Sequence, residues 1–135
     1  MEPWNIAHRG GAALMPENTL AAFAAAVARG ADGAELDVQL SRDGEVVVHH
    51  DYRLNAGYCR DGNGKWIAGS APRIKDLTLE ELRGFDIGRP DPAGEYARAH
   101  PLLHALDGAR IPTLEEVIAA VKASSTFLLF VELKS

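Results

Sequence analysis

The chain has 135 residues, enough for one domain, and 47% of them are hydrophobic while 24% are charged. This composition supports a hydrophobic core and excludes a disordered chain. The net charge of −5 argues against a protein that wraps nucleic acid or binds membranes through a polybasic patch. Cys59 is the single cysteine, which excludes an intrachain disulfide, and the N-terminus lacks the features of a secretory signal. We therefore expect a cytoplasmic protein without stable membrane insertion.

The first part of the chain predicts a strand followed by a helix. Residues 4–7 form a short apolar run that ends at the glycine-rich stretch His8-Arg9-Gly10-Gly11. A helix then begins after Pro16, with Asn18 or Thr19 as its cap, and ends before Gly30. Its expected apolar face consists of Leu20, Phe23, Ala24 and Val27.

Two further strands follow. Residues 34–40 alternate, so that Glu35, Asp37 and Gln39 share one face while apolar side chains take the other. The dipeptide Asp43-Gly44 is a turn signal, and residues 45–50 form a β-branched strand that ends at Asp51.

The second half of the chain is less regular. We interpret residues 52–109 as an insertion, in which residues 77–82 form a short helix with a Thr78/Glu81 capping box. A second capping box, Thr113/Glu116, begins a helix whose expected apolar face consists of Leu114, Val117, Ile118 and Val121. Residues 127–133 predict a last strand. Strands separated by helices indicate a parallel sheet buried on both faces.

Polar residues collect where these strands end, which is where parallel α/β barrels form their active sites. Glu35 and Asp37 would share one face, and two buried like charges need a cation or a proton. With Glu132 they offer three hard oxygen ligands, which suit Mg²⁺ or Ca²⁺ better than zinc. A solvated strand face is the alternative interpretation.

Several other side chains could serve such a site. His8 and His50 end strands and could supply a general acid and a general base, whereas His49 points to the opposite face. Arg9 could hold a phosphate oxygen, and Lys134 would share the face of Glu132. We expect no catalytic role for the two tryptophans, the cysteine and two further histidines: Trp4, Trp66, Cys59, His100 and His104.

The order of these motifs resembles the glycerophosphodiester phosphodiesterase family. The matching stretches run from Ile6-Ala7-His8-Arg9-Gly10-Gly11 through Pro16-Glu17-Asn18-Thr19, Glu35-Leu36-Asp37-Val38 and His50-Asp51 to Glu132-Leu133-Lys134. The resemblance implies a TIM (β/α)8 barrel of the PLC-like phosphodiesterase type and hydrolysis of glycerophosphodiesters to glycerol 3-phosphate and an alcohol. It also implies that His8 and His50 are the acid–base pair, that Glu35, Asp37 and Glu132 bind the divalent cation, and that Arg9 contacts phosphate.

A barrel of this class needs about 250 residues, so this chain corresponds to the N-terminal half of the domain, with about four strands. The insertion at 52–109 would follow the third strand. A half-barrel leaves open edges, so we expect either a homo-oligomer or a poorly active fragment. Two other functions remain open: a lysophospholipase D-type enzyme acting on a larger lipid, and a non-catalytic interaction module.

Overall fold

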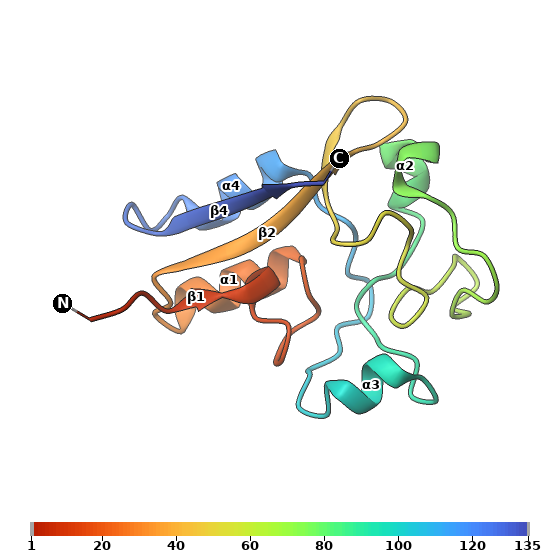
Figure 1. Ribbon diagram of the computed structural model, residues 1–135, viewed down its shortest axis with the longest axis horizontal. Helices are drawn as coiled ribbons and strands as arrows, with labels where there is room; N and C mark the ends of the chain where they lie inside the picture. Colours follow the sequence, from red (N-terminus) through yellow and green to blue (C-terminus); the bar gives the residue numbers. More distant parts are fainter. Residues whose placement is uncertain (1, 135) are drawn as a thin grey trace.

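A computed structural model describes residues 2–134, which form a four-stranded sheet, two helices on one of its faces and an irregular excursion. β2 (Gly33–Leu40) is the central strand, and β1 (Ile6–Ala7) and β4 (Leu128–Leu133) pair with it in parallel (Figure 1). β3 (Val46–Val48) pairs with β2 antiparallel. Val38 pairs with both Val48 and Leu133, so β3 and β4 lie on opposite edges of β2.

The direction of β3 corrects the prediction of a wholly parallel sheet. Parallel neighbours need a long crossover, but β2 and β3 are joined only by residues 41–45. The Ser41 N–H donates to the carbonyl of Glu45, and Gly44 turns the chain with a φ of 81°. β3 is therefore the return arm of a hairpin. The sheet has four strands, as expected, but only three of them are parallel, and the long irregular segment follows β3, after the second parallel strand.

Two helices cover one face of the sheet. α1 (Leu20–Ala28) and α4 (Leu114–Val121) begin at the side-chain caps Thr19 and Thr113, and the predicted capping box of α4 is confirmed. Their shared core with the sheet consists of Phe23, Ala34, Leu36, Val38, Val48, Val117 and Val121. Within residues 2–134, no helix combines the length and the apolar character needed to cross a membrane.

The predicted apolar faces of both helices need correction. Leu20 is exposed because the first turn of α1 borders a hollow lined by residues 106–112, away from the sheet. Ala24 and Ile118 are also exposed. The buried positions of α1 include Ala22 and Ala26, whose small side chains let the helix approach the strands.

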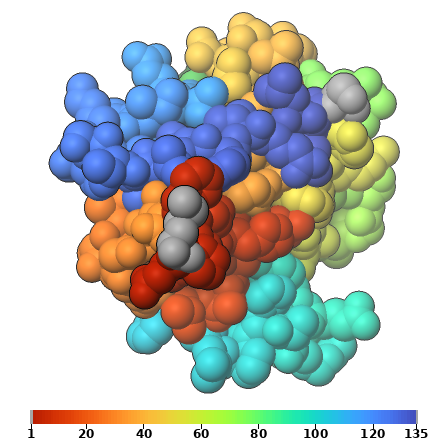
Figure 2. All heavy atoms as spheres, turned by 60° about the vertical axis from the view of Figure 1, so that its left-hand side comes forward, coloured from red at the N-terminus to blue at the C-terminus, as the bar shows by residue number. Residues whose placement is uncertain are grey.

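Residues 52–109 form an irregular excursion with a core of its own. It contains the 3-10 helix η2 (Ile74–Asp76), the predicted α2 (Leu79–Leu82) with its Thr78/Glu81 capping box, and α3 (Glu95–Ala99), which the sequence did not indicate. Its core consists of Val47, Leu54, Tyr58, Cys59, Ala71, Ile74, Leu82, Ile87 and Ile111. Figure 2 shows that α3, in cyan, projects at the end of the molecule away from β4, in blue.

Candidate active site

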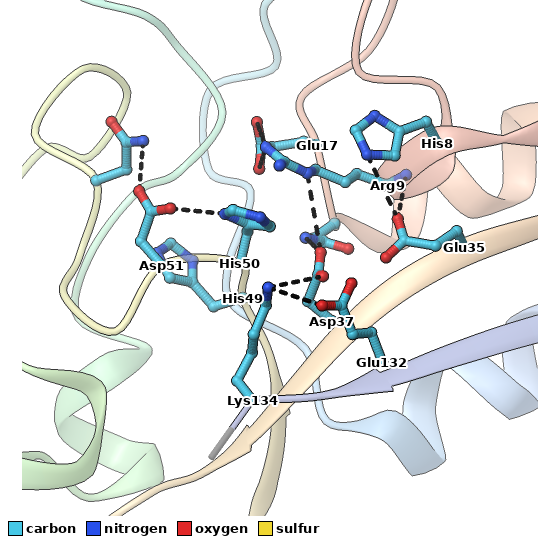
Figure 3. A network of polar contacts seen from close by, with 12 residues as sticks. His8, Arg9, Glu17, Glu35, Asp37, His49, His50, Asp51, Glu132 and Lys134 are labelled. Carbon is cyan, nitrogen blue, oxygen red and sulfur yellow. Dashed lines mark hydrogen bonds and ion pairs between the residues drawn. The ribbon is translucent and has the colours of Figure 1, made fainter.

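Three carboxylates from two neighbouring strands form the centre of the site. Glu35 and Asp37 alternate along β2, and Glu132 on β4 is the register partner of Asp37. One oxygen of each side chain lies within 4.8 Å of the others. Asp37 is fully buried, Glu35 is half-buried and Glu132 is exposed (Figure 3). The structure thus brings together the three acidic residues that the sequence analysis selected.

The electrostatics of this cluster are unfavourable without an added positive charge. Burial, followed by the charge of Asp37, raises the pKa of the Glu35 carboxyl to about 6. Oδ1 of Asp37 is buried and has no hydrogen bond to any described residue. The Lys134 ammonium partly compensates, at 3.1 Å from Oε1 of Glu132 and 3.8 Å from Oδ1 of Asp37. A hard oxygen donor set that includes a buried oxygen without a hydrogen bond fits Mg²⁺ or Ca²⁺.

The loop after β1 places His8 and Arg9 beside these carboxylates. Arg9 has a left-handed backbone with a φ of 52°, and its N–H donates to Oε2 of Glu35 at 3.3 Å. Nε2 of the exposed His8 ring lies 3.8 Å from the same oxygen. Gly10, with a φ of 79°, packs so closely on α1 that an added Cβ would lie 3.0 Å from the Cβ of Ala22. The tight contact with α1 therefore fixes the loop.

Two residues of the site, Glu17 and Asn18, were given no role in it from the sequence, although they lie in a stretch that resembles the family. The Glu17 carboxylate is buried and accepts hydrogen bonds from Nη1 of Arg9 at 3.2 and 3.3 Å. Asn18, buried and with a φ of 56°, donates from Nδ2 to Oδ2 of Asp37 at 3.3 Å. Nε of Arg9 lies 3.9 Å from the same Asp37 oxygen. Glu17 and Asn18 therefore hold Arg9 and Asp37 in place.

The two adjacent histidines occupy different environments. Nδ1 of the half-buried His50 lies 2.7 Å from Oδ1 of Asp51, whose other oxygen accepts from Asn55 at 2.8 Å. Although burial opposes it, these hydrogen bonds lower the pKa of the Asp51 carboxyl. His49 is completely buried, with its ring 6.0 Å from that of Tyr58, and burial lowers its pKa. In Figure 3 the His50 ring lies on the side of Asp51 that faces Arg9 and Asp37.

These observations define an α/β protein with an acidic site on its parallel strands, flanked by an arginine and two histidines. The chain belongs to the glycerophosphoryl diester phosphodiesterase family, whose model matches residues 8–135. It is 42% identical over 130 residues to a glycerophosphodiester phosphodiesterase of Caldanaerobacter subterraneus, covering 96% of this chain and 44% of the relative.

Solved structures of similar proteins agree with this assignment. A crystal structure described as a putative glycerophosphoryl diester phosphodiesterase from Silicibacter pomeroyi superposes with a TM-score of 0.92 at 36% identity, covering 99% of this chain and 47% of that one. A phosphodiesterase from Oleispira antarctica, solved with the product sn-glycerol-3-phosphate, gives a TM-score of 0.72 at 31% identity, covering 98% of this chain and 44% of that one. This chain spans less than half the length of these relatives.

Proposed function

We propose that this chain carries the metal-binding and acid–base residues of an enzyme that hydrolyses glycerophosphodiesters to glycerol 3-phosphate and an alcohol. The convergence of Glu35, Asp37 and Glu132 within 4.8 Å, beside His8 and Arg9, carries this proposal. The product-bound relative from Oleispira antarctica supports the substrate class.

The charged residues would bind the phosphate diester together with a divalent cation. Glu35, Asp37 and Glu132 would hold Mg²⁺ or Ca²⁺, which, when bound, neutralises phosphate charge and makes phosphorus more electrophilic. Arg9 would bind a non-ester phosphate oxygen, since its guanidinium lies beside Asp37. Lys134 would add positive charge on the side of Glu132. Together these groups would stabilise the charge that develops during the displacement at phosphorus.

The two histidines would move the protons of the reaction. Because Nδ1 of His50 is directed at Asp51, its Nε2 is left to exchange a proton with the substrate. His8 lies on the other side of the cluster, next to Glu35. One imidazole would take the proton of the attacking water or substrate hydroxyl, and the other would protonate the leaving alkoxide.

We also propose that the sheet of this chain is part of a TIM barrel. Three parallel strands with helices on one face, and superposition on 47% of a longer family member, support a TIM barrel that further chain would complete. The carboxylates would then face the barrel interior. Residues 52–109 would be an insertion in that barrel, placed between its second strand and the next helix.

Turnover of glycerophosphocholine with Mg²⁺, measured with and without EDTA, tests the proposed function. We expect release of glycerol 3-phosphate that EDTA abolishes and that added Mg²⁺ or Ca²⁺ restores. Lysophosphatidylcholine, assayed in parallel, separates the proposed activity from a lysophospholipase D. Failure to release glycerol 3-phosphate in a full-length chain that binds Mg²⁺ would exclude the proposal and favour a non-catalytic module.

A further inference from the structure

A tyrosine of the excursion reaches the loop that carries Arg9. Oη of Tyr96, on α3, donates to Oε1 of Glu17 at 2.6 Å, although the two residues are 79 positions apart. The Tyr96 ring lies between two others, 4.9 Å from Tyr58 and stacked at 4.0 Å on His100. Nδ1 of His100 also lies 2.8 Å from the Tyr96 carbonyl oxygen. The excursion therefore fixes the position of this hydroxyl group.

The Glu17 carboxylate depends on few partners. Its side chain is only 2% exposed, so its charge must be balanced by hydrogen bonds and by a cation inside the protein. Nη1 of Arg9 contacts both oxygens at 3.2–3.3 Å, and the Tyr96 hydroxyl supplies the shorter bond. Burial, and then the charge of Glu17, raise the pKa of Tyr96 well above its usual value, so the hydroxyl remains a donor.

We propose that Tyr96 is a positioning residue for Arg9, acting through Glu17, and this inference rests on the proposed function of Arg9 as the phosphate contact. The Tyr96 hydroxyl donates one of the hydrogen bonds that the buried Glu17 carboxylate needs. The Arg9 guanidinium can therefore lie between Glu17 and Asp37, with its Nε 3.9 Å from Oδ2 of Asp37. Without that hydroxyl, Arg9 alone would have to satisfy a buried carboxylate. The guanidinium would then move towards Glu17 and away from the phosphate.

Equilibrium binding of sn-glycerol 3-phosphate in the presence of Mg²⁺ tests this role on the full chain. We expect Tyr96→Phe to weaken binding about tenfold, the size of one hydrogen bond to a charged group. In turnover of glycerophosphocholine the same variant should raise KM and also lower kcat, because Arg9 stabilises the charge that develops at phosphorus. The fall in kcat should be far smaller than for His50→Ala, because the groups that transfer protons are untouched. Tyr58→Phe is the matched control: it changes a neighbouring ring whose hydroxyl makes no hydrogen bond to Glu17 in the described structure, and it should leave binding unchanged.

A second variant shows whether the effect passes through Glu17. Glu17→Asp withdraws the carboxylate from Tyr96 and should also weaken binding, and adding Tyr96→Phe to it should cause no further loss. If Tyr96→Phe fails to melt cooperatively, Glu17→Asp alone carries the test on the same readout. The inference would be overturned by unchanged binding in Tyr96→Phe, by an equal loss in Tyr58→Phe, or by additive losses in the double variant. Where Glu17→Asp carries the test, unchanged binding in that variant would overturn it. Absence of binding in the unmodified protein would instead remove the proposed function itself.

Discussion

Neighbouring residues of this protein have opposite environments, and His49 and His50 show it most clearly. His49 is enclosed in the core of the excursion, whereas His50 is half-buried and paired with Asp51. A buried imidazole with no route to substrate can contribute only to packing. The half-buried ring, with one nitrogen bound to a carboxylate, has the arrangement of a general acid or base.

Replacement of His50 by alanine should therefore lower turnover at least about a hundredfold while the protein stays folded. The measurement is kcat for glycerophosphocholine, together with a thermal melt. His104→Ala, at an exposed position in the excursion, is the control and should keep its activity. A folded His49→Ala variant with a larger loss of turnover than His50→Ala would reverse the assignment.

The repulsion between Glu35 and Asp37 leads to a second prediction at this scale. Glu35→Gln removes a charge that burial and Asp37 disfavour, so the metal-free protein should be as stable as the unmodified protein or more so. Mg²⁺ should no longer raise its Tm, because one ligand is lost. The exposed Glu45→Gln is the control. If Mg²⁺ raises the Tm of Glu35→Gln as much as that of the unmodified protein, Glu35 is not a ligand.

At the scale of the elements, the close contact of β2 with β4 decides where Glu132 lies. Gly33 is the register partner of Leu128, and a Cβ at Gly33 would collide with the Leu128 carbonyl group. This contact requires glycine for steric reasons and not for a special backbone angle. Any side chain at position 33 would separate the two strands that carry the three carboxylates.

Gly33→Ala should accordingly reduce the free energy of unfolding by about 1–3 kcal/mol and weaken Mg²⁺ binding. Chemical denaturation and a Mg²⁺ titration measure the two effects. Gly62→Ala, where an added Cβ meets no atom within 4 Å, should be close to neutral. Equal stability of the two variants would show that β4 can shift without cost.

Because Cys59 is buried in the core of the excursion, we expect its thiol to react slowly. Burial raises the pKa of this thiol to about 12, so only on the order of one molecule in ten thousand carries the thiolate at pH 8. Reaction with a thiol reagent should be at least about a hundredfold slower than for a small free thiol, and urea should restore the rate. Because the folded pKa is raised, the stabilisation from burying the neutral thiol is present below pH 9 and declines towards pH 12. Rapid labelling of the folded protein would contradict a closed core.

The sequence predicted the elements better than their arrangement. Thr78/Glu81 and Thr113/Glu116 are local signals, and both capping boxes are present. The direction of β3 was wrong because a β-branched run has the same pattern in parallel and antiparallel strands. The contact of Tyr96 with Glu17 could not be predicted, since it depends on how the excursion folds back over 79 residues.

At the scale of the whole molecule, residues 2–134 cover the sheet face that carries the carboxylates only in part: Asp37 is buried, Glu35 is half-buried and Glu132 is exposed. α1 and α4 cover the opposite face, and Trp4 and Phe130, whose rings are 6.1 Å apart, are 65% and 43% exposed. Within the described residues β4 pairs with β2 alone, so its outer edge offers free backbone groups. Figure 2 shows β4, in blue, running along the surface.

The 135-residue chain by itself should therefore self-associate and turn over substrate poorly. Analytical ultracentrifugation measures the mass, and glycerophosphocholine hydrolysis measures the activity. Val131→Lys, which places a charge on the exposed part of β4, should shift the chain towards monomer, whereas Leu102→Lys, at a still more exposed position in the excursion, should not. A stable monomer with enzyme-like turnover would show that no further strands are needed.

The short strand β3 also limits how this protein can change during evolution. Val47 packs in the core of the excursion and Val48 in the core under α1 and α4, so successive residues serve different cores. Deletion of a single residue between positions 46 and 50 would exchange the two sets of side chains and carry His50 to the position of His49. The hairpin turn at 42–44 can vary in length without that exchange, because it precedes the paired residues. Related chains should therefore differ in length at the turn and keep a constant spacing from β3 to Asp51.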